Sequence, residues 1–352
     1  MRLGRWSLLA VGIAVAACAS TIGPVVPSIQ VLVVLDSLDD TLRIIPVDSP
    51  EVMHKVVVSY PTAAFGKHAI ALNGQYVAIS HGGSVRMASV VTGSGICDDI
   101  SVTPTASIAS LTFNNGYVYA AIPQINKAPH IGQFDCGLGD ALIRGGPRAF
   151  VVDARGTPFV VTGDNPDAPS WLTTTGSQPG NMPLSPSDSI VLSQPGHARG
   201  GVLASDGFLY VINSGSGVVP NARLSQVDPV NRVEQNVYNG FGTAPQYIAT
   251  DGNRVFVASA LEGLMSYNTH TKQVERDYNS AIQLFGTPRG LVADDVGRLY
   301  ALIAGSCAPT GQTGSIRRFG ADLVSQSSVT VGHCPVAIGV TDIPSTLYSF
   351  KP

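Results

Sequence analysis

Arginine recurs at one place in a stretch that the chain repeats. The sequence "PRAFVVDARGTPFVV", which begins at Pro147, aligns without a gap with "PRGLVADDVGRLYAL", which begins 141 residues later at Pro288. Both have an arginine before an apolar run, then an Asp, a turn that ends in Gly, and an aromatic residue. The residues at the arginine position of four such copies are Arg148, Arg199, Gln246 and Arg289. Because guanidinium groups match carboxylates and phosphates, arginines that met at one site would favour an anionic ligand.

A structural role is the alternative for these arginines. Since the arginine recurs as part of a repeat, each could bond the carbonyls of neighbouring loops or pair with a nearby Asp. The Asp of "VVDARG" and of "VADDVG" has a structural interpretation as well. An Asp side chain readily accepts hydrogen bonds from the backbone two residues on, so we expect both to hold tight turns rather than act as bases.

Histidine and acidic side chains near the same repeats could bind a divalent metal. His81 and Asp164 each follow an apolar run, and imidazole and carboxylate groups are common metal ligands. Solvated loop side chains are the alternative, and no other cofactor is expected. The sequence has no Gly-x-Ser-x-Gly elbow, no phosphate-binding glycine loop and no His-Glu-x-x-His motif. Nucleophilic catalysis therefore has little support.

One long segment interrupts the regular spacing. "TGDNPDAPSWLTTTGSQPGNMPLSPSD" is rich in proline and contains Trp171, the second of the two tryptophans in the sequence. Long loops on a regular scaffold are a common place for binding. Trp171 is therefore a candidate contact residue, with a buried position in a strand as the alternative.

The repeats themselves predict an all-β fold. Charged residues make up only 13% of the chain, Gly and Pro are plentiful, and apolar runs are short. The aromatic residues of six copies are spaced by 43, 40, 51, 46 and 44 residues, and they are Tyr76, Tyr119, Phe159, Tyr210, Phe256 and Tyr300. A period of 40 to 50 residues built from short strands is typical of a β-propeller with four strands in each blade.

Six copies run from about residue 67 to residue 331, so a seventh blade must come from the chain ends. "VLVVLDS", "TLRIIPVDS" and "HKVVVS" near the N-terminus predict three strands, and "PVAIGVTD" after Cys334 predicts the inner strand. Joining both ends in one blade would close the ring and remove its free edge. "STLYSF" at residues 345–350 also resembles a strand, so two C-terminal strands in the closing blade are the alternative.

The stretches "PQYIATDGNRVFVAS" and "LYVINSGSG" resemble the repeats of seven-bladed propellers of the YVTN and NHL type. That resemblance covers most of the chain and implies a seven-bladed propeller. Propellers of this kind include protein-binding scaffolds, lyases and metal-dependent lactonases, so the resemblance does not select a function.

In a propeller, the loops that lead into the inner strands and the loops that join the second and third strands lie on one face, here called the top face. Ligands usually bind on this face at the mouth of the central channel. The candidate ligand-binding residues expected there are His68, Arg148, Arg199, Gln246, Arg289, Asn213 and Trp171.

The N-terminus predicts export. Residues 1–17 combine Arg2 and Arg5 with a short apolar run, as in a secretory signal, and "VAAC" resembles a bacterial lipobox that ends at Cys18. We expect lipidation of Cys18, a tether over residues 18–29 and a propeller over residues 30–352; cleavage after Ala19 without a lipid is the alternative. Removal of residues 1–17 would change the formal net charge from −3 to −5, which gives no reason to expect nucleic acid as a partner.

Four cysteines follow Cys18, and an even number in an exported chain favours disulfides, with three possible pairings. In the predicted topology Cys307 and Cys334 fall on the top face of adjacent units, whereas Cys97 and Cys136 fall near the bottom face of two others. The expected bridges are therefore Cys307–Cys334 and Cys97–Cys136, with unpaired thiols as the alternative.

Together these features predict an envelope lipoprotein, at the outer membrane or the cell surface, whose propeller binds a ligand or a protein through its top face without catalysis. The expected partner is an envelope or extracellular protein or a small anionic ligand, and the chain is expected to be a monomer. One alternative is a metal-dependent lactonase or lyase that uses His68, His81 and Asp164 at the channel mouth. Another is an assembly subunit of the envelope, which a large exposed apolar patch would support.

Overall fold

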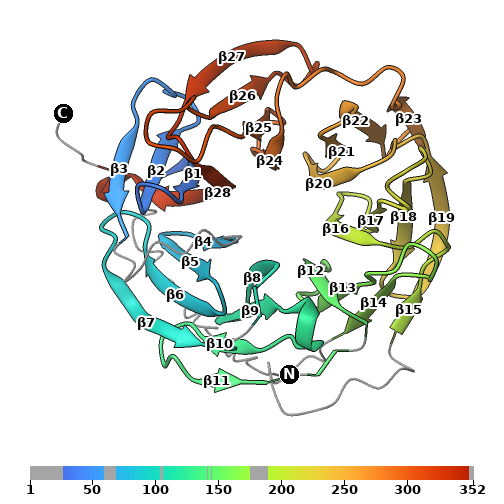
Figure 1. Cartoon of the computed structure of the whole chain (residues 1–352), viewed down its shortest axis with the longest axis horizontal. Helices are drawn as coiled ribbons and strands as arrows, with labels where there is room; N and C mark the ends of the chain where they lie inside the picture. Colours follow the sequence, from blue (N-terminus) through green and yellow to red (C-terminus); the bar gives the residue numbers. More distant parts are fainter. Residues whose placement is uncertain are drawn as a thin grey trace, which may run out of the picture.

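The computed structural model describes residues 27–58, 69–103, 106–140, 142–143, 145–174 and 189–348. Strands in these residues form seven antiparallel sheets of four strands each, arranged radially in a ring (Figure 1). The inner strands contact one another in the order β4, β8, β12, β16, β20, β24 and β28, and β28 contacts β4 again. The predicted seven-bladed β-propeller is confirmed.

Three blades occupy the first half of the chain. Blade 1 consists of β4 (Ile70–Asn73), β5 (Tyr76–His81), β6 (Ser84–Ser89) and β7 (Gly95–Ser101). Blade 2 consists of β8 (Ser110–Asn114), β9 (Tyr117–Ala121), β10 (His130–Gly132) and β11 (Leu138–Gly139), with a 3-10 turn, η1 (Pro123–Ile125). Blade 3 consists of β12 (Pro147–Val152), β13 (Pro158–Thr162), β14 (Trp171–Thr174) and β15 (Ser189–Val191).

Three further blades follow with the same strand order. Blade 4 consists of β16 (Ala198–Leu203), β17 (Leu209–Asn213), β18 (Arg223–Asp228) and β19 (Val233–Asn239). Blade 5 consists of β20 (Pro245–Thr250), β21 (Arg254–Ser259), β22 (Gly263–Asn268) and β23 (Gln273–Arg276). Blade 6 consists of β24 (Pro288–Ala293), β25 (Leu299–Ile303), β26 (Ser315–Phe319) and β27 (Ser325–Thr330).

Blade 7 joins the two ends of the chain, as predicted. Its strands, from the channel outward, are β28 (Pro335–Pro344), β1 (Ser28–Asp36), β2 (Thr41–Pro46) and β3 (His54–Val57). The alternative with two C-terminal strands is wrong, because residues Ser345–Leu347 form a 3-10 turn, η3, directly after β28. Tyr348, which follows this turn, packs edge-on against His54 with ring centroids 5.3 Å apart.

The turn between the first and second strands of a blade is held by an aspartate. The Asp153 carboxylate accepts hydrogen bonds from the backbone N–H groups of Arg155 (2.9 Å) and Thr157 (2.8 Å). In the equivalent turn of blade 6, the Asp294 carboxylate accepts from Arg298 N–H at 2.8 Å. The expected structural role of both aspartates is confirmed. Where the turn is Asp-Gly, as at Gly207, the glycine has a φ of +83°, a conformation that residues with a Cβ rarely adopt.

The repeated aromatic residues are packing residues. Five of the six have at most 5% of their surface exposed, and these are Tyr119, Phe159, Tyr210, Phe256 and Tyr300. They lie on the second strands, where apolar residues from neighbouring blades meet in continuous clusters. The repeat period therefore reflects the need to fill the space between blades.

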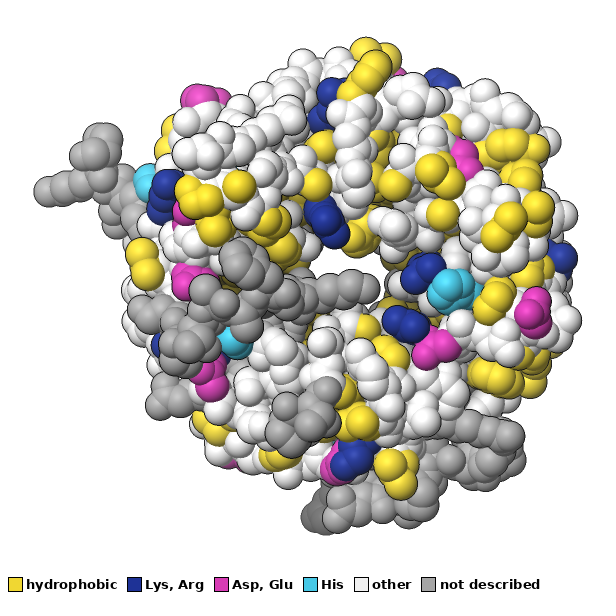
Figure 2. Space-filling model, in the orientation of Figure 1, with side chains coloured by type: hydrophobic (Ala, Val, Ile, Leu, Met, Phe, Trp, Pro, Cys, Tyr) yellow, Lys and Arg dark blue, Asp and Glu magenta, His cyan; other side chains and the backbone are white. Residues whose placement is uncertain are grey.

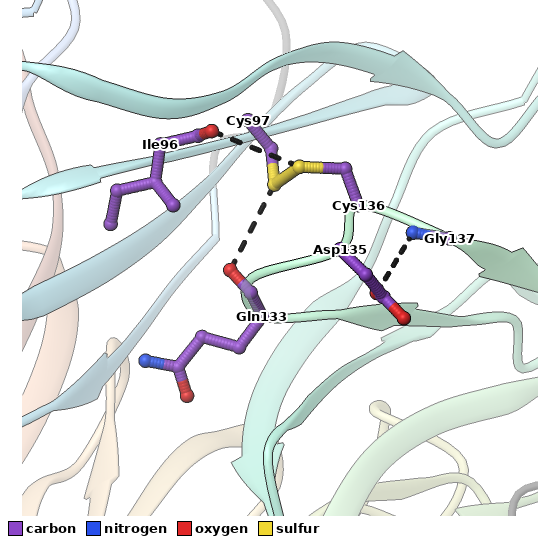
Figure 3. The surroundings of a disulfide bond; sticks show 6 residues. All are labelled: Ile96, Cys97, Gln133, Asp135, Cys136 and Gly137. Carbon is purple, nitrogen blue, oxygen red and sulfur yellow. Dashed lines mark hydrogen bonds between the residues drawn. A yellow bond between two sulfur atoms is a disulfide. The ribbon is translucent and has the colours of Figure 1, made fainter.

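Both predicted disulfides are present. Cys97 on β7 is bonded to Cys136 in the turn after β10, which links blades 1 and 2 (Figure 3). Cys307, which follows β25, is bonded to Cys334, which directly precedes β28, and so links blade 6 to the closing blade. Paired cysteines are typical of an oxidising compartment and of exported proteins. Within the described residues, no helix has the length and apolar character needed to cross a membrane.

The expected signal at residues 1–17 and the lipidation site Cys18 lie outside the described residues, as does His68. The structure therefore begins near the end of the expected tether, and β1 starts at Ser28.

We expect the paired substitutions Cys307→Ser and Cys334→Ser to lower the free energy of unfolding by about 2–4 kcal/mol, because they release the link between blade 6 and the closing strand. Urea unfolding without reductant would measure this. The variant with Cys97→Ser and Cys136→Ser is the matched comparison, since it removes a link that lies away from the closing blade. An unchanged unfolding midpoint for the Cys307–Cys334 variant would contradict the expectation.

Candidate functional site

A cavity of about 770 Å³ lies among the inner strands, and residues of all seven blades line it. This volume is in the range of sites that bind small molecules. Four of the candidate residues line it together, namely Arg148, Arg199, Gln246 and Arg289. Figure 2 shows dark blue basic side chains around the central opening, two of them beside a cyan histidine and a magenta acidic side chain.

Each of these four residues occupies a β-bulge. Pro147 is opposite Thr162 and Ala149 is opposite Val161, so Arg148 has no partner on the neighbouring strand. The same shift in register falls at Arg199, Gln246 and Arg289 in the next three blades. A bulge redirects the side chain of the extra residue. The repeated sequence therefore presents one side chain from each of these four blades to the cavity.

Arg148 forms an ion pair with Asp164, which follows β13; both side chains are partly exposed. Gly146 makes room for this carboxylate, because a Cβ at residue 146 would lie 2.4 Å from Asp164 Oδ2. The structural alternative, in which the arginine pairs with a nearby Asp, therefore describes Arg148. The contact leaves part of the guanidinium fork available, since only Nε is bonded to Asp164.

Arg199 is held by neutral groups. Its Nε donates a hydrogen bond to Ser214 Oγ at 3.1 Å, and Ser214 Oγ donates to the His197 carbonyl at 3.2 Å. Burial, and after it the positive charge of Arg148, lower the pKa of Arg199 from its ordinary value, although the guanidinium stays protonated. A bound anion would relieve this unfavourable environment.

Arg289 and Tyr247 form a second polar group on the same rim. The Arg289 side chain is exposed, and Tyr247, on the adjacent blade, also lines the cavity. Burial raises the pKa of the Tyr247 hydroxyl, and the Arg289 guanidinium, which contacts this hydroxyl, opposes that shift. Among the described residues, neither Arg199 nor Arg289 forms an ion pair with a carboxylate.

Two other candidates lie away from the cavity lining. Asn213 is fully buried within blade 4, where its Nδ2 donates to Ser225 Oγ at 3.3 Å. Trp171 is a strand residue on β14, paired with Thr162 and Val191, and its ring lies against Gly145. The structure therefore places Trp171 in a strand, where its side chain is half-buried rather than buried.

The two candidate metal ligands come from different blades. His81 ends β5 in blade 1, whereas Asp164 follows β13 in blade 3 and is bonded to Arg148. In the part of the chain that the structure describes, no group of three or more His, Cys, Asp or Glu side chains is placed to hold a metal ion.

Sequence reasoning missed Tyr247 and the Ser214 hydroxyl. Tyr247 follows Gln246 at a place where the other copies have Ala149, Gly200 and Gly290. A large polar residue in a position otherwise held by small residues was a signal that could have identified it. Ser214 had no comparable signal, because it lies in the loop "NSGSG" without a fixed place in the repeat.

No protein-family profile and no curated protein sequence matches this chain. Its structure is similar to that of streptogramin B lyase, with a TM-score of 0.59 and 14% identity over 81% of this chain and 96% of the lyase chain. It is also similar to a chain of hydrazine synthase from Kuenenia stuttgartiensis, with a TM-score of 0.59 and 15% identity over 82% of this chain and 100% of the other. A chain of the mitotic checkpoint complex is also similar, with a TM-score of 0.56 and 8% identity over 76% of this chain and 80% of that chain. At these identities the likeness shows the fold alone, and these proteins have unrelated activities.

We expect the stability of the protein to fall as the pH is lowered from 7.5 to 5, in part because of His197. Burial, with the charges of Arg199 and Arg148, lowers the pKa of His197 below the ordinary value near 6.5. The histidine in the unfolded state then binds a proton more readily than the histidine in the folded state. Stability is therefore lost as the pH falls through the pKa that this histidine has in the unfolded chain. His197→Asn should reduce this loss, measured by urea unfolding at each pH.

Asparagine suits this test because it tolerates the φ of +69° at residue 197. Burial also lowers the pKa of His130. The matched variant His130→Asn should therefore remove a separate part of the same pH dependence of stability. A wild-type pH dependence in His197→Asn would show that His197 is not involved.

Proposed function

We propose that this chain binds a small organic anion at the mouth of its channel, on the top face, without catalysis. The observation that carries the proposal is the row of bulge residues Arg148, Arg199, Gln246 and Arg289 around one cavity. Two of its three arginines have no described carboxylate as a partner. A binding site with this excess of positive charge is suited to a carboxylate or another anion.

Electrostatics favour a charged rather than a neutral ligand. The positive charge of Arg148 acts unfavourably on the protonated Arg199, and the carboxylate of Asp164 compensates for only part of this repulsion. An anion placed between them would form charge-assisted hydrogen bonds in a partly enclosed site, where such bonds are stronger than in bulk water. A neutral ligand would leave the repulsion in place.

The alternative of a metal-dependent lactonase or lyase has less support. It requires Asp164 as a metal ligand, whereas this carboxylate already forms an ion pair with Arg148. The streptogramin B lyase shares the propeller architecture at 14% identity, and this similarity does not extend to an activity.

We also propose that the protein is exported and anchored in the cell envelope through a lipid on Cys18. The two disulfides support export, and the sequence "VAAC" supports lipidation at the end of a secretory signal. In this arrangement an envelope or extracellular protein could also be a partner of the top face.

We expect citrate to raise the melting temperature of the protein made from Ser20 onward, relative to sodium chloride at the same ionic strength. Arg199→Gln and Arg289→Gln should each weaken citrate binding by roughly tenfold or more, because each removes a charge-assisted hydrogen bond. Titration calorimetry would measure the dissociation constants.

Arg276→Gln is the matched control, since it removes the same charge from the outer strand β23. Equal citrate affinity in all three variants and the wild type would contradict a site at the channel mouth.

We expect Cys18→Ser to abolish incorporation of labelled palmitate when the full chain is expressed in a bacterium with a lipoprotein pathway. The physical reason is that the thiol is the acceptor of the lipid. Mass spectrometry of the mature N-terminus distinguishes this from simple cleavage: a lipidated Cys18 supports the proposal, and an unmodified chain that starts after Ala19 refutes it.

A further inference from the structure

We propose that the ligand is an amphiphilic organic anion, with its charged group against blades 3 to 6 and an apolar body against blades 7, 1 and 2. This inference rests on the proposed function and specifies the chemical class of its ligand. It follows from the unequal distribution of side chains around the cavity.

The charged and polar part of the lining is continuous. Blades 3, 4, 5 and 6 are consecutive around the ring and contribute the basic arc, which we define as Arg148, Arg199, Gln246, Tyr247 and Arg289. The remaining three blades are also consecutive, since β28 contacts β24 on one side and β4 on the other. Among the described lining residues, the charges therefore lie along one side of the cavity rather than evenly around it.

The opposite side is apolar. Blades 7, 1 and 2 contribute the apolar arc, which we define as Val336, Ala337, Ile338, Ala69, Ile70 and Leu111. Among the described lining residues of these blades there is no charged side chain, and the polar side chains among them are those of Ser37 and Ser110. Val336 and Ile70 are only half-buried, so each retains apolar surface that a ligand could cover.

The contrast is sharpest at the bulge. In blade 7, Asp36 is opposite Pro335 and Leu35 is opposite Ala337, so Val336 occupies the bulge position that holds arginine in blades 3, 4 and 6. The described pairs of the first two strands in blades 1 and 2 show no bulge, because their register is continuous from Ile70 and from Ser110. The same structural position therefore presents a cation on one side of the cavity and an isopropyl group on the other.

A compact polyanion matches only half of this cavity. Phosphate or citrate on the basic arc would leave the apolar arc in contact with water, and an uncharged apolar ligand would leave Arg199 and Arg289 without an anion. A carboxylate with an attached hydrocarbon chain or ring satisfies both arcs. Each buried methylene should then increase affinity by up to about fourfold, until the apolar arc is covered.

Titration calorimetry with acetate, butyrate, hexanoate and octanoate at constant ionic strength would test this. We expect the affinity to rise with chain length, with octanoate bound at least tenfold more tightly than butyrate. Val336→Thr, which keeps the shape of the side chain and replaces a methyl group with a hydroxyl, should reduce this increase. Arg289→Gln should weaken all the carboxylates by a similar factor and leave the dependence on chain length unchanged.

Val324→Thr is the matched control, because Val324 is an exposed valine of blade 6 outside the cavity lining. If the melting temperature of Val336→Thr is more than a few degrees below that of the wild type, Ile70→Thr serves as the second apolar-arc variant. Affinities that do not change with chain length, together with arginine-dependent citrate binding, would overturn this inference and leave the proposed function intact. Failure of every anion to bind in an arginine-dependent way would overturn both.

Discussion

The antiparallel pairing of β1 with β28 is the contact on which the whole ring depends. It runs from Ser28 opposite Pro344 to Asp36 opposite Pro335, and so hydrogen-bonds the two ends of the chain to each other. Without it, blade 7 would lose its inner strand, and the ring would have two open edges with unpaired backbone groups. The other six blades are each formed from consecutive sequence, so among the seven sheets of the described residues only this one needs distant segments to meet.

The end of this pairing is reinforced by a buried charge. Asp36 is fully buried, forms an ion pair with Arg43 at 3.1 Å, and accepts a hydrogen bond from the N–H of Cys334 at 3.3 Å. Gly332 must lack a side chain here, since a Cβ would lie 1.1 Å from Asp36 Oδ2. A buried carboxylate without its partners would be strongly unfavourable, so the ion pair and the N–H fix how β28 enters the ring. Because Cys334, Pro335 and Val336 line the cavity, closure of the ring also determines its apolar side.

Most of the fold could be predicted from the sequence, since the features that define a blade are local. The Asp-Gly turns, the apolar runs and the buried aromatic residues recur within each copy, and the order of strands follows from them. The disulfide pairing followed from the same topology. The closing blade was harder, because Tyr348 kept the period of the repeat although it follows a 3-10 turn and packs on His54.

The site was less predictable, because it depends on which side of a strand each residue faces. Asn213 lies at the end of β17, as expected, but it is fully buried, and its side chain donates a hydrogen bond to Ser225 within the sheet. Strand pairing similarly holds Trp171 in β14. The arginines were identified from their repeated position. The bulge that presents them could not be predicted, because it depends on register between two strands rather than on either strand alone.

The bulge also explains how one repeat can carry different chemistry in different blades. The residue at this position has no partner across the sheet, so its side chain is not required for packing within the blade. Arginine, glutamine and valine can therefore replace one another there, while Asp153 and Asp294 keep their places in the turns and Phe159 and Tyr300 keep theirs in the core. The constraints that fix the ring thus leave one position free to vary in each of the five blades that have this bulge. In this chain that freedom places cations on one side and apolar groups on the other.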